Sequence, residues 1–171
     1  MTLAQPQNIT LDEFLKRAWI EDSPAWEYIN GKEVQKPMGG GKRSTLQKRL
    51  VAAVDQVSSQ YEAFPELRCT FGGRSVVPGI VVIAQDQIPV DADGDIAGSG
   101  VQFALPWMIE ILSPGQSQTR ITGNILHCLK HGSRLAWLLD SAERSILVYQ
   151  PGRLPDLLVE EERLAVLEDI D

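Results

Sequence analysis

The spacing of hydrophobic residues along the chain predicts three helices separated by strands. The first helix begins at a capping box formed by Thr10 and Glu13, whose side chains satisfy free backbone N–H groups, and it runs to about residue 20. The third helix spans about 117–131, carries one apolar face and stops at Gly132. Both patterns are typical of helices that pack one face on a sheet.

The second helix follows a glycine-rich loop over 37–42. A further capping box at Ser44 and Gln47 opens this helix, which runs to about residue 60. Its predicted buried stripe consists of Leu46, Leu50, Val54 and Val57. The loop is similar to a phosphate-binding P-loop, but Arg43 stands where that motif needs Ser or Thr directly after Gly-Lys. Nucleoside triphosphate binding is therefore not expected.

Turn residues between short apolar runs predict two hairpins. Asn30-Gly31 predicts a tight hairpin, because both turn positions need a positive φ. Gly72-Gly73 predicts a second hairpin, whose later strand extends to about residue 83. Pro78 in that strand has no N–H to donate, which places it at an edge, at a bulge or where two strands diverge. A divergence would open a notch in the sheet.

The remaining apolar runs predict the centre and one edge of the sheet. A buried strand over 105–113, the third helix and a strand over 135–140 predict a parallel pair joined by a right-handed crossover. A strand over 145–149 and a small edge hairpin of 157–159 with 164–167 complete the pattern with antiparallel pairs. The expected fold is therefore α+β, with a mixed central sheet flanked by helices and an N-terminal hairpin extension.

Length and composition predict a single globular domain over residues 1–171. With 43% hydrophobic residues, the chain is long enough to bury a core of its own. It has no signal-like N-terminus and no apolar run approaching the roughly 18 residues of a membrane span, so we expect a cytoplasmic protein without a membrane partner. Cys69 and Cys128 are expected to be reduced core residues.

The net charge of −7 opposes a nucleic-acid partner, because phosphate binding relies on Lys and Arg. However, seven acids against Arg163 over 156–171 give this tail a charge of −6, which leaves about −1 for the other 155 residues. Over 32–49, Glu33 opposes six cations: Lys32, Lys36, Lys42, Arg43, Lys48 and Arg49. This segment is either a solvated helix face or a face that contacts DNA.

One carboxylate, Glu110, interrupts the apolar strand over 105–113. A buried carboxylate is costly unless it meets a cation or lies at a notch, so Glu110 is the strongest candidate site residue. About thirty residues earlier, Gly79 separates two apolar runs at a point where an acid on the strand would serve catalysis. The arrangement predicts a metal-dependent nuclease with one ligand missing.

Three other groups are weaker candidates for metal sites. The acids Asp91, Asp93 and Asp95 alternate in a polar surface loop over 84–104, but the positions of glycine and glutamate that a calcium loop requires are not matched. His127 and His131 have the i, i+4 spacing of a zinc pair without a visible third ligand, and they can equally end the helix. Asp140 is better placed to cap the turn that follows it.

Five segments together carry a resemblance to a known family: Glu27–Lys32, Lys36–Met38, Gly72–Pro78, Ile109–Pro114 and Trp137–Asp140. They resemble the Uma-type endonucleases, which are abundant in cyanobacteria and belong to the PD-(D/E)XK restriction-endonuclease-like superfamily. The resemblance covers nearly the whole chain. It implies a restriction-endonuclease-like core, DNA as the partner and hydrolysis of phosphodiester bonds with Mg²⁺ or Mn²⁺.

The resemblance also implies roles for particular residues. Strand carboxylates hold the metal, which polarises the phosphate and activates water, while a lysine steadies the nucleophile. Glu27 and Glu110 match the family pattern, and Gly79 stands in place of the metal-binding Asp. The candidate positions for the lysine are Arg120 and Asn124, one helical turn apart.

Other departures from the family pattern concern the contact with DNA. Arg43 stands in place of a histidine, and Lys42, Arg43 and Arg74 are the candidate DNA contacts. We therefore expect an endonuclease whose catalysis is impaired, because loss of a direct metal ligand has a large catalytic cost. The alternative is a noncatalytic DNA-binding or protein-interaction module that retains the fold. Either form is compatible with a homodimer.

Overall fold

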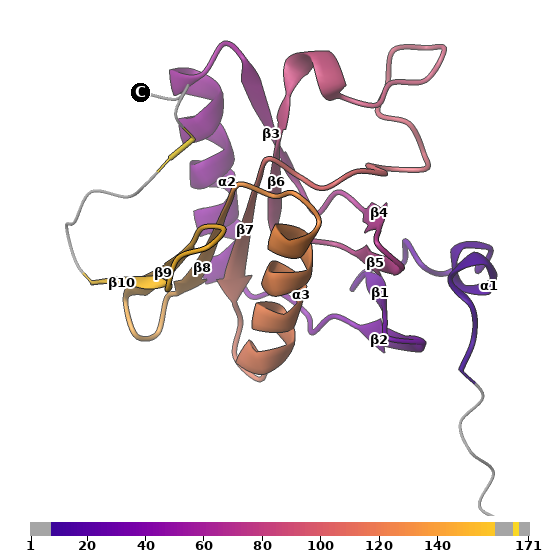
Figure 1. The fold of residues 1–171 in the computed structure, drawn as a ribbon, viewed down its shortest axis with the longest axis horizontal. Coiled ribbons are helices and arrows are strands. Elements are labelled where there is room, and N and C mark those ends of the chain that lie inside the picture. The colour runs from indigo at the N-terminus through magenta and orange to yellow at the C-terminus, as the bar shows by residue number, and fades with distance from the viewer. Residues whose placement is uncertain (1–7, 160–165, 168–171) are drawn as a thin grey trace, which may run out of the picture.

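The computed structural model describes residues 8–159, 166 and 167 of the chain (Figure 1). Its helices are α1 (Leu11–Leu15), α2 (Gly41–Val57) and α3 (Gln118–Lys130), with a short 3-10 helix η1 (Gln85–Gln87). Its strands are β1 (Trp26–Ile29), β2 (Lys32–Gln35), β3 (Tyr61–Pro65), β4 (Cys69–Phe71), β5 (Arg74–Val76), β6 (Ile80–Ala84), β7 (Trp107–Leu112), β8 (Leu135–Asp140), β9 (Ser145–Tyr149) and β10 (Asp156–Val159). None of the described helices is long and apolar enough to cross a membrane.

The larger sheet has six strands in the order β10-β9-β8-β7-β6-β3. Only β7 and β8 run parallel in it, in a register from Trp107 beside Leu135 to Leu112 beside Asp140. Its other pairs are antiparallel. The predicted mixed sheet and its parallel crossover through α3 are therefore confirmed.

Helices α2 and α3 cover opposite faces of this sheet (Figure 1). Because successive side chains of a strand point to opposite faces, Ile109 and Ile111 of β7 pack in the cluster under α2, and Met108 packs in the cluster under α3. Cys69 and Cys128 are free thiols in the α3 cluster, as expected, and burial raises the pKa of Cys128 to about 12.

The smaller sheet has the order β2-β1-β5-β4 and lies beside the larger one, with α1 at its outer side (Figure 1). Asn30 and Gly31 both have a positive φ, 51° and 80°, as the predicted hairpin turn requires. Arg68 ties this sheet to the N-terminal segment, because its guanidinium donates to the carbonyl of Ile20 at 2.7 Å and to the hydroxyl of Ser75 at 3.0 Å.

The predicted strand over 74–83 is two strands that belong to different sheets. β5 ends at Val76 in the smaller sheet, and β6 begins at Ile80 in the larger one. Pro78 and Gly79 form the passage between them. Of the three placements open to Pro78, the structure shows the divergence of strands, because a residue without an N–H cannot continue a ladder on both sides.

The helix limits differ from those expected. α1 ends at Leu15, five residues early, and the Trp19 ring beyond it packs on Trp26 with 4.7 Å between centroids. α2 begins at Gly41 after Gly40, so the capping box expected at Ser44 was wrong. The Ser44 hydroxyl instead donates back to the carbonyl of Gly40.

Other expectations about exposure and pairing also need correction. Val57, at the end of α2, is 53% exposed and does not continue the buried stripe. The expected surface loop over 84–104 contributes Val101 to the core, bridged to Cys69. β3 was not predicted, and β10 pairs with β9. Residues 164 and 165 of the expected last hairpin lie outside the described residues.

Candidate functional site

The site is built where the chain passes from β5 to β6 beside β7. Glu110 on β7 is 2% exposed, and its carboxylate accepts a hydrogen bond from the backbone N–H of Gly79 at 3.1 Å. The strand alternation that sends Ile109 and Ile111 toward α2 directs Glu110 toward α3. The fold thus places Glu110 beside Gly79, the position at which the resemblance implies a metal-binding Asp.

A second buried carboxylate, Glu27 of β1, lies at the same junction. Its Oε1 accepts the backbone N–H of Val77 at 2.9 Å, and its Oε2 accepts the side-chain amide of Asn124 at 3.4 Å. Asn124 is 3% exposed and comes from the middle of α3. The fold therefore brings together Glu27, Glu110 and Asn124 from three separate elements.

Two buried cations complete the cluster, and the sequence did not single them out for this role. Lys36, 6% exposed, donates to the carbonyl of Val77. Arg43, 8% exposed, lies on the first turn of α2 with its Nη2 3.0 Å from Glu66 Oε1. The contact with Glu66 is one of charge alone, because Arg43 Nε and Nη2 make no aligned hydrogen bond within the described structure.

The charges of the cluster act on Glu110. Burial raises the pKa of its carboxyl, and the nearby Glu27 carboxylate raises it further. Lys36 opposes this shift most strongly, followed by the Gly79 N–H and Arg43. Two buried acids thus share the cluster with two buried cations, of which Lys36 donates to the Val77 carbonyl and Arg43 forms its ion pair with Glu66. The sequence predicts that a buried acid needs a nearby cation, but it does not show which cation lies there.

Gly79 occupies a position from which a side chain would point at Glu110. A Cβ built there lies 3.6 Å from Glu110 Oε2 and 3.0 Å from the carbonyl of Ile109. The carbonyl of Gly79 accepts hydrogen bonds from the Glu66 N–H and the Gln47 side chain. The backbone is therefore fixed, and the position is tight but directed at the carboxylate.

Comparison with known proteins shows the family and the fold class of the chain. The Uma2 family, described as "Putative restriction endonuclease", matches residues 11–170. The chain belongs to the Uma2 family. A crystal structure of "a putative nuclease belonging to DUF820" from Anabaena variabilis is similar with a TM-score of 0.85 and 47% identity, covering 93% of this chain and 89% of that chain. No curated protein matches the sequence. The nuclease-like fold class and the family expected from the sequence are confirmed.

The residues of this Uma2 protein do not fit a complete magnesium site. Mg²⁺ prefers several oxygen ligands in octahedral geometry, usually with more than one carboxylate. In the parts of the chain that the structure describes, no three Asp, Glu, His or Cys side chains gather as ligands would. Glu27 and Glu110 stand without the Asp at position 79, and the buried cations Lys36 and Arg43 already act electrostatically on Glu110.

The other candidate residues of the Uma2 protein differ in whether they contact this cluster. Arg120 is exposed on the first turn of α3, and no contact joins it to Glu27 or Glu110 in the described structure. Lys42 is exposed at the start of α2, whereas Arg43 is buried. Arg74 reaches Asn124 Oδ1 at 3.4 Å, so it touches the cluster from the side of the smaller sheet.

The alternative metal groups show turn and helix contacts. Asp140 Oδ1 accepts the N–H groups of Ala142 and Glu143 at 2.9 and 3.0 Å, which caps the β8–β9 turn as expected. Asp91 Oδ1 accepts two N–H groups of its own turn in the same way. His127 and His131 do lie side by side, with ring centroids 4.2 Å apart.

Proposed function

We propose that this Uma2 protein is a DNA-binding protein with a nuclease fold, whose Mg²⁺-dependent hydrolysis of phosphodiester bonds is impaired at Gly79. The family and the Anabaena structure support the nuclease-like part of this proposal. The observation that carries the impairment is the direction of the missing side chain at Gly79, toward Glu110 Oε2 at 3.6 Å from the Cβ position.

Two further features support impairment. Asn124 occupies a candidate position for the lysine, but its side chain is neutral and its amide donates a hydrogen bond to Glu27. An amide holds no positive charge that could steady an attacking hydroxide. The positive charges of Lys36 and Arg43 already act on Glu110, which weakens the attraction of this carboxylate for a divalent cation.

The proposal is tested by cleavage of supercoiled plasmid DNA with Mn²⁺. We expect no cleavage by the unmodified protein and cleavage by the double variant Gly79→Asp/Asn124→Lys, which restores one metal ligand and one ammonium. The matched control is Gly79→Asn/Asn124→Lys, which has the shape of aspartate without its charge and should be inactive. Adding Glu110→Ala to the restored variant should abolish its cleavage.

Two results would count against the proposal. If the unmodified protein cleaves DNA and Glu110→Ala abolishes that cleavage, the site is catalytically active with glycine at position 79. Absence of cleavage by a folded double variant would favour the alternative, a noncatalytic DNA-binding or protein-interaction module. The positive charge that Lys36 already supplies near Glu110 is the observation that favours that alternative.

A further inference from the structure

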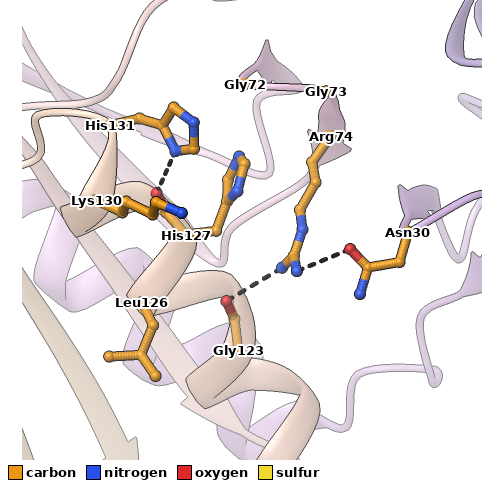
Figure 2. Close-up of a pocket in the computed structure, with 9 residues that line it drawn as sticks. All are labelled: Asn30, Gly72, Gly73, Arg74, Gly123, Leu126, His127, Lys130 and His131. Atoms are coloured by element: carbon orange, nitrogen blue, oxygen red, sulfur yellow. Dashed lines mark hydrogen bonds between the residues drawn. The ribbon is translucent and has the colours of Figure 1, made fainter.

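A basic pocket lies beside the cluster, between α3 and the β4–β5 turn (Figure 2). Its volume is about 530 Å³, and its lining consists of Asn30, Gly72, Gly73, Arg74, Gly123, Leu126, His127, Lys130 and His131. The lining contains two permanent cations and two histidines but no aspartate or glutamate. In a chain with a net charge of −7, such a local surplus of positive charge favours an anionic ligand.

The charge of Arg74 is held in place without being neutralised. Its guanidinium donates to the carbonyl of Gly123 at 3.1 Å and to Asn30 Oδ1 at 3.0 Å (Figure 2). Both acceptors are uncharged, and no carboxylate within the described structure forms an ion pair with Arg74. A guanidinium fixed by neutral acceptors keeps its full attraction for a phosphate.

The two histidines form the opposite wall of the pocket. His127 donates from Nε2 to the carbonyl of Phe71 at 3.1 Å, and His131 donates from Nδ1 to the carbonyl of His127 at 2.7 Å. Burial lowers the pKa of His127, and the charges of His131, Arg74 and Lys130 lower it further. The permanent cations of the pocket are therefore Arg74 and Lys130.

The glycines of the β4–β5 turn keep the pocket open. A Cβ on Gly72 would lie 2.4 Å from His131 Nε2, whereas a Cβ on Gly73 would meet no atom within 4 Å. The His131 ring thus rests directly on the turn, and the space beside Gly73 is free. Backbone with positive φ and no side chain allows a ligand to approach closely.

We infer that this pocket binds a backbone phosphate of duplex DNA, with Arg74 and Lys130 as its charged contacts and the Gly72-Gly73 turn as its floor. The inference rests on the proposed function, because it takes DNA as the partner. The pocket is also continuous with the cluster, since Arg74 contacts Asn124 and Asn124 contacts Glu27. DNA bound here would pass beside Glu27 and Glu110.

The test is the affinity for a fluorescent DNA duplex, measured by anisotropy in EDTA at several salt concentrations. The variant Lys130→Gln removes an exposed charge of the pocket, and Lys48→Gln removes an exposed charge of α2, on the other face of the larger sheet. We expect Lys130→Gln to weaken binding about fivefold and to lower the slope of affinity against salt by about one, while Lys48→Gln changes affinity less than about twofold.

The outcomes separate this inference from the proposed function, because the metal-free assay does not depend on cleavage. Equal affinity of Lys130→Gln and the unmodified protein would show that the pocket does not bind the phosphate, and it would leave DNA binding as such intact. An equal or larger loss of affinity for Lys48→Gln would place the DNA contact on α2 and would also contradict phosphate binding in the pocket. No binding by the unmodified protein would overturn both the pocket and the DNA partner.

Discussion

At the scale of single residues, Glu110 determines how the site responds to pH. Burial raises the pKa of its carboxyl above the ordinary 4.5, so the folded protein keeps a proton that the unfolded chain has already lost. The free energy of unfolding therefore falls as pH rises from about 4.5 through the raised pKa of Glu110. Its stabilising contribution is fully present only below that window.

The variant Glu110→Gln tests this behaviour. Glutamine keeps the shape and an oxygen for the Gly79 N–H but has no proton to lose, so we expect a smaller fall in unfolding free energy between acidic and neutral pH. Urea denaturation at both ends of the window measures it. The control is Glu143→Gln, because Glu143 is exposed on the β8–β9 turn. An equal pH dependence of Glu110→Gln and the unmodified protein would contradict the account.

The acids of the cluster could be found from the sequence, but their cations could not. An acid inside the apolar run of β7 is conspicuous, and the resemblance directed attention to Glu27. Lys36 and Arg43 belong to a segment of scattered basic residues, most of which are exposed. Only the tertiary structure shows that these two turn inward, Lys36 toward the Val77 carbonyl and Arg43 toward Glu66.

At the scale of elements, the packing of the β4–β5 turn against the end of α3 includes a close contact of His131 with Gly72. The His131 ring lies where a Cβ of Gly72 would be, and Gly72 itself has a φ of 57°. Gly73 has a φ of 79° but open space around its Cβ position. A side chain at either position would therefore carry the strain of a positive φ, but only one at Gly72 would also collide with His131.

Alanine substitutions should resolve these two effects. Each left-handed alanine costs about 1–2 kcal/mol, and Gly72→Ala should cost about 1 kcal/mol more by breaking the hydrogen bond of His131 to the His127 carbonyl. In a His131→Ala background the two substitutions should cost the same. Urea denaturation of the five variants provides the comparison. A difference that persists without His131 would show that the turn is held by another contact.

The elements were predictable where their patterns were strong. The amphipathic run of α3 and the glycine turns gave the right structures, because helix periodicity and positive φ are local properties. The predicted end of α1 and the predicted start of α2 were wrong, because the sequence pattern showed neither the packing of Trp19 on Trp26 nor the N-cap at Gly40. β3 was missed because its five residues form a ladder only with the distant β6.

At the scale of the whole molecule, the candidate site depends on how two sheets meet. A sequence pattern can show that Pro78 interrupts a strand, but it does not show that the halves join different sheets. That separation places Gly79 against Glu110 and leaves room for Glu27, Lys36 and Asn124 around them. The central claim is that this meeting point has the shape of a metal site but lacks one ligand.

Binding of Mn²⁺, followed by electron paramagnetic resonance of the free ion, tests this claim most directly. We predict that the unmodified protein and the isosteric control Gly79→Asn leave the free Mn²⁺ signal unchanged, while Gly79→Asp reduces it by binding one ion, because only aspartate adds the missing carboxylate beside Glu110. Binding of one ion by the unmodified protein, lost in Glu110→Gln, would contradict the claim and show that the site is complete without an acid at position 79.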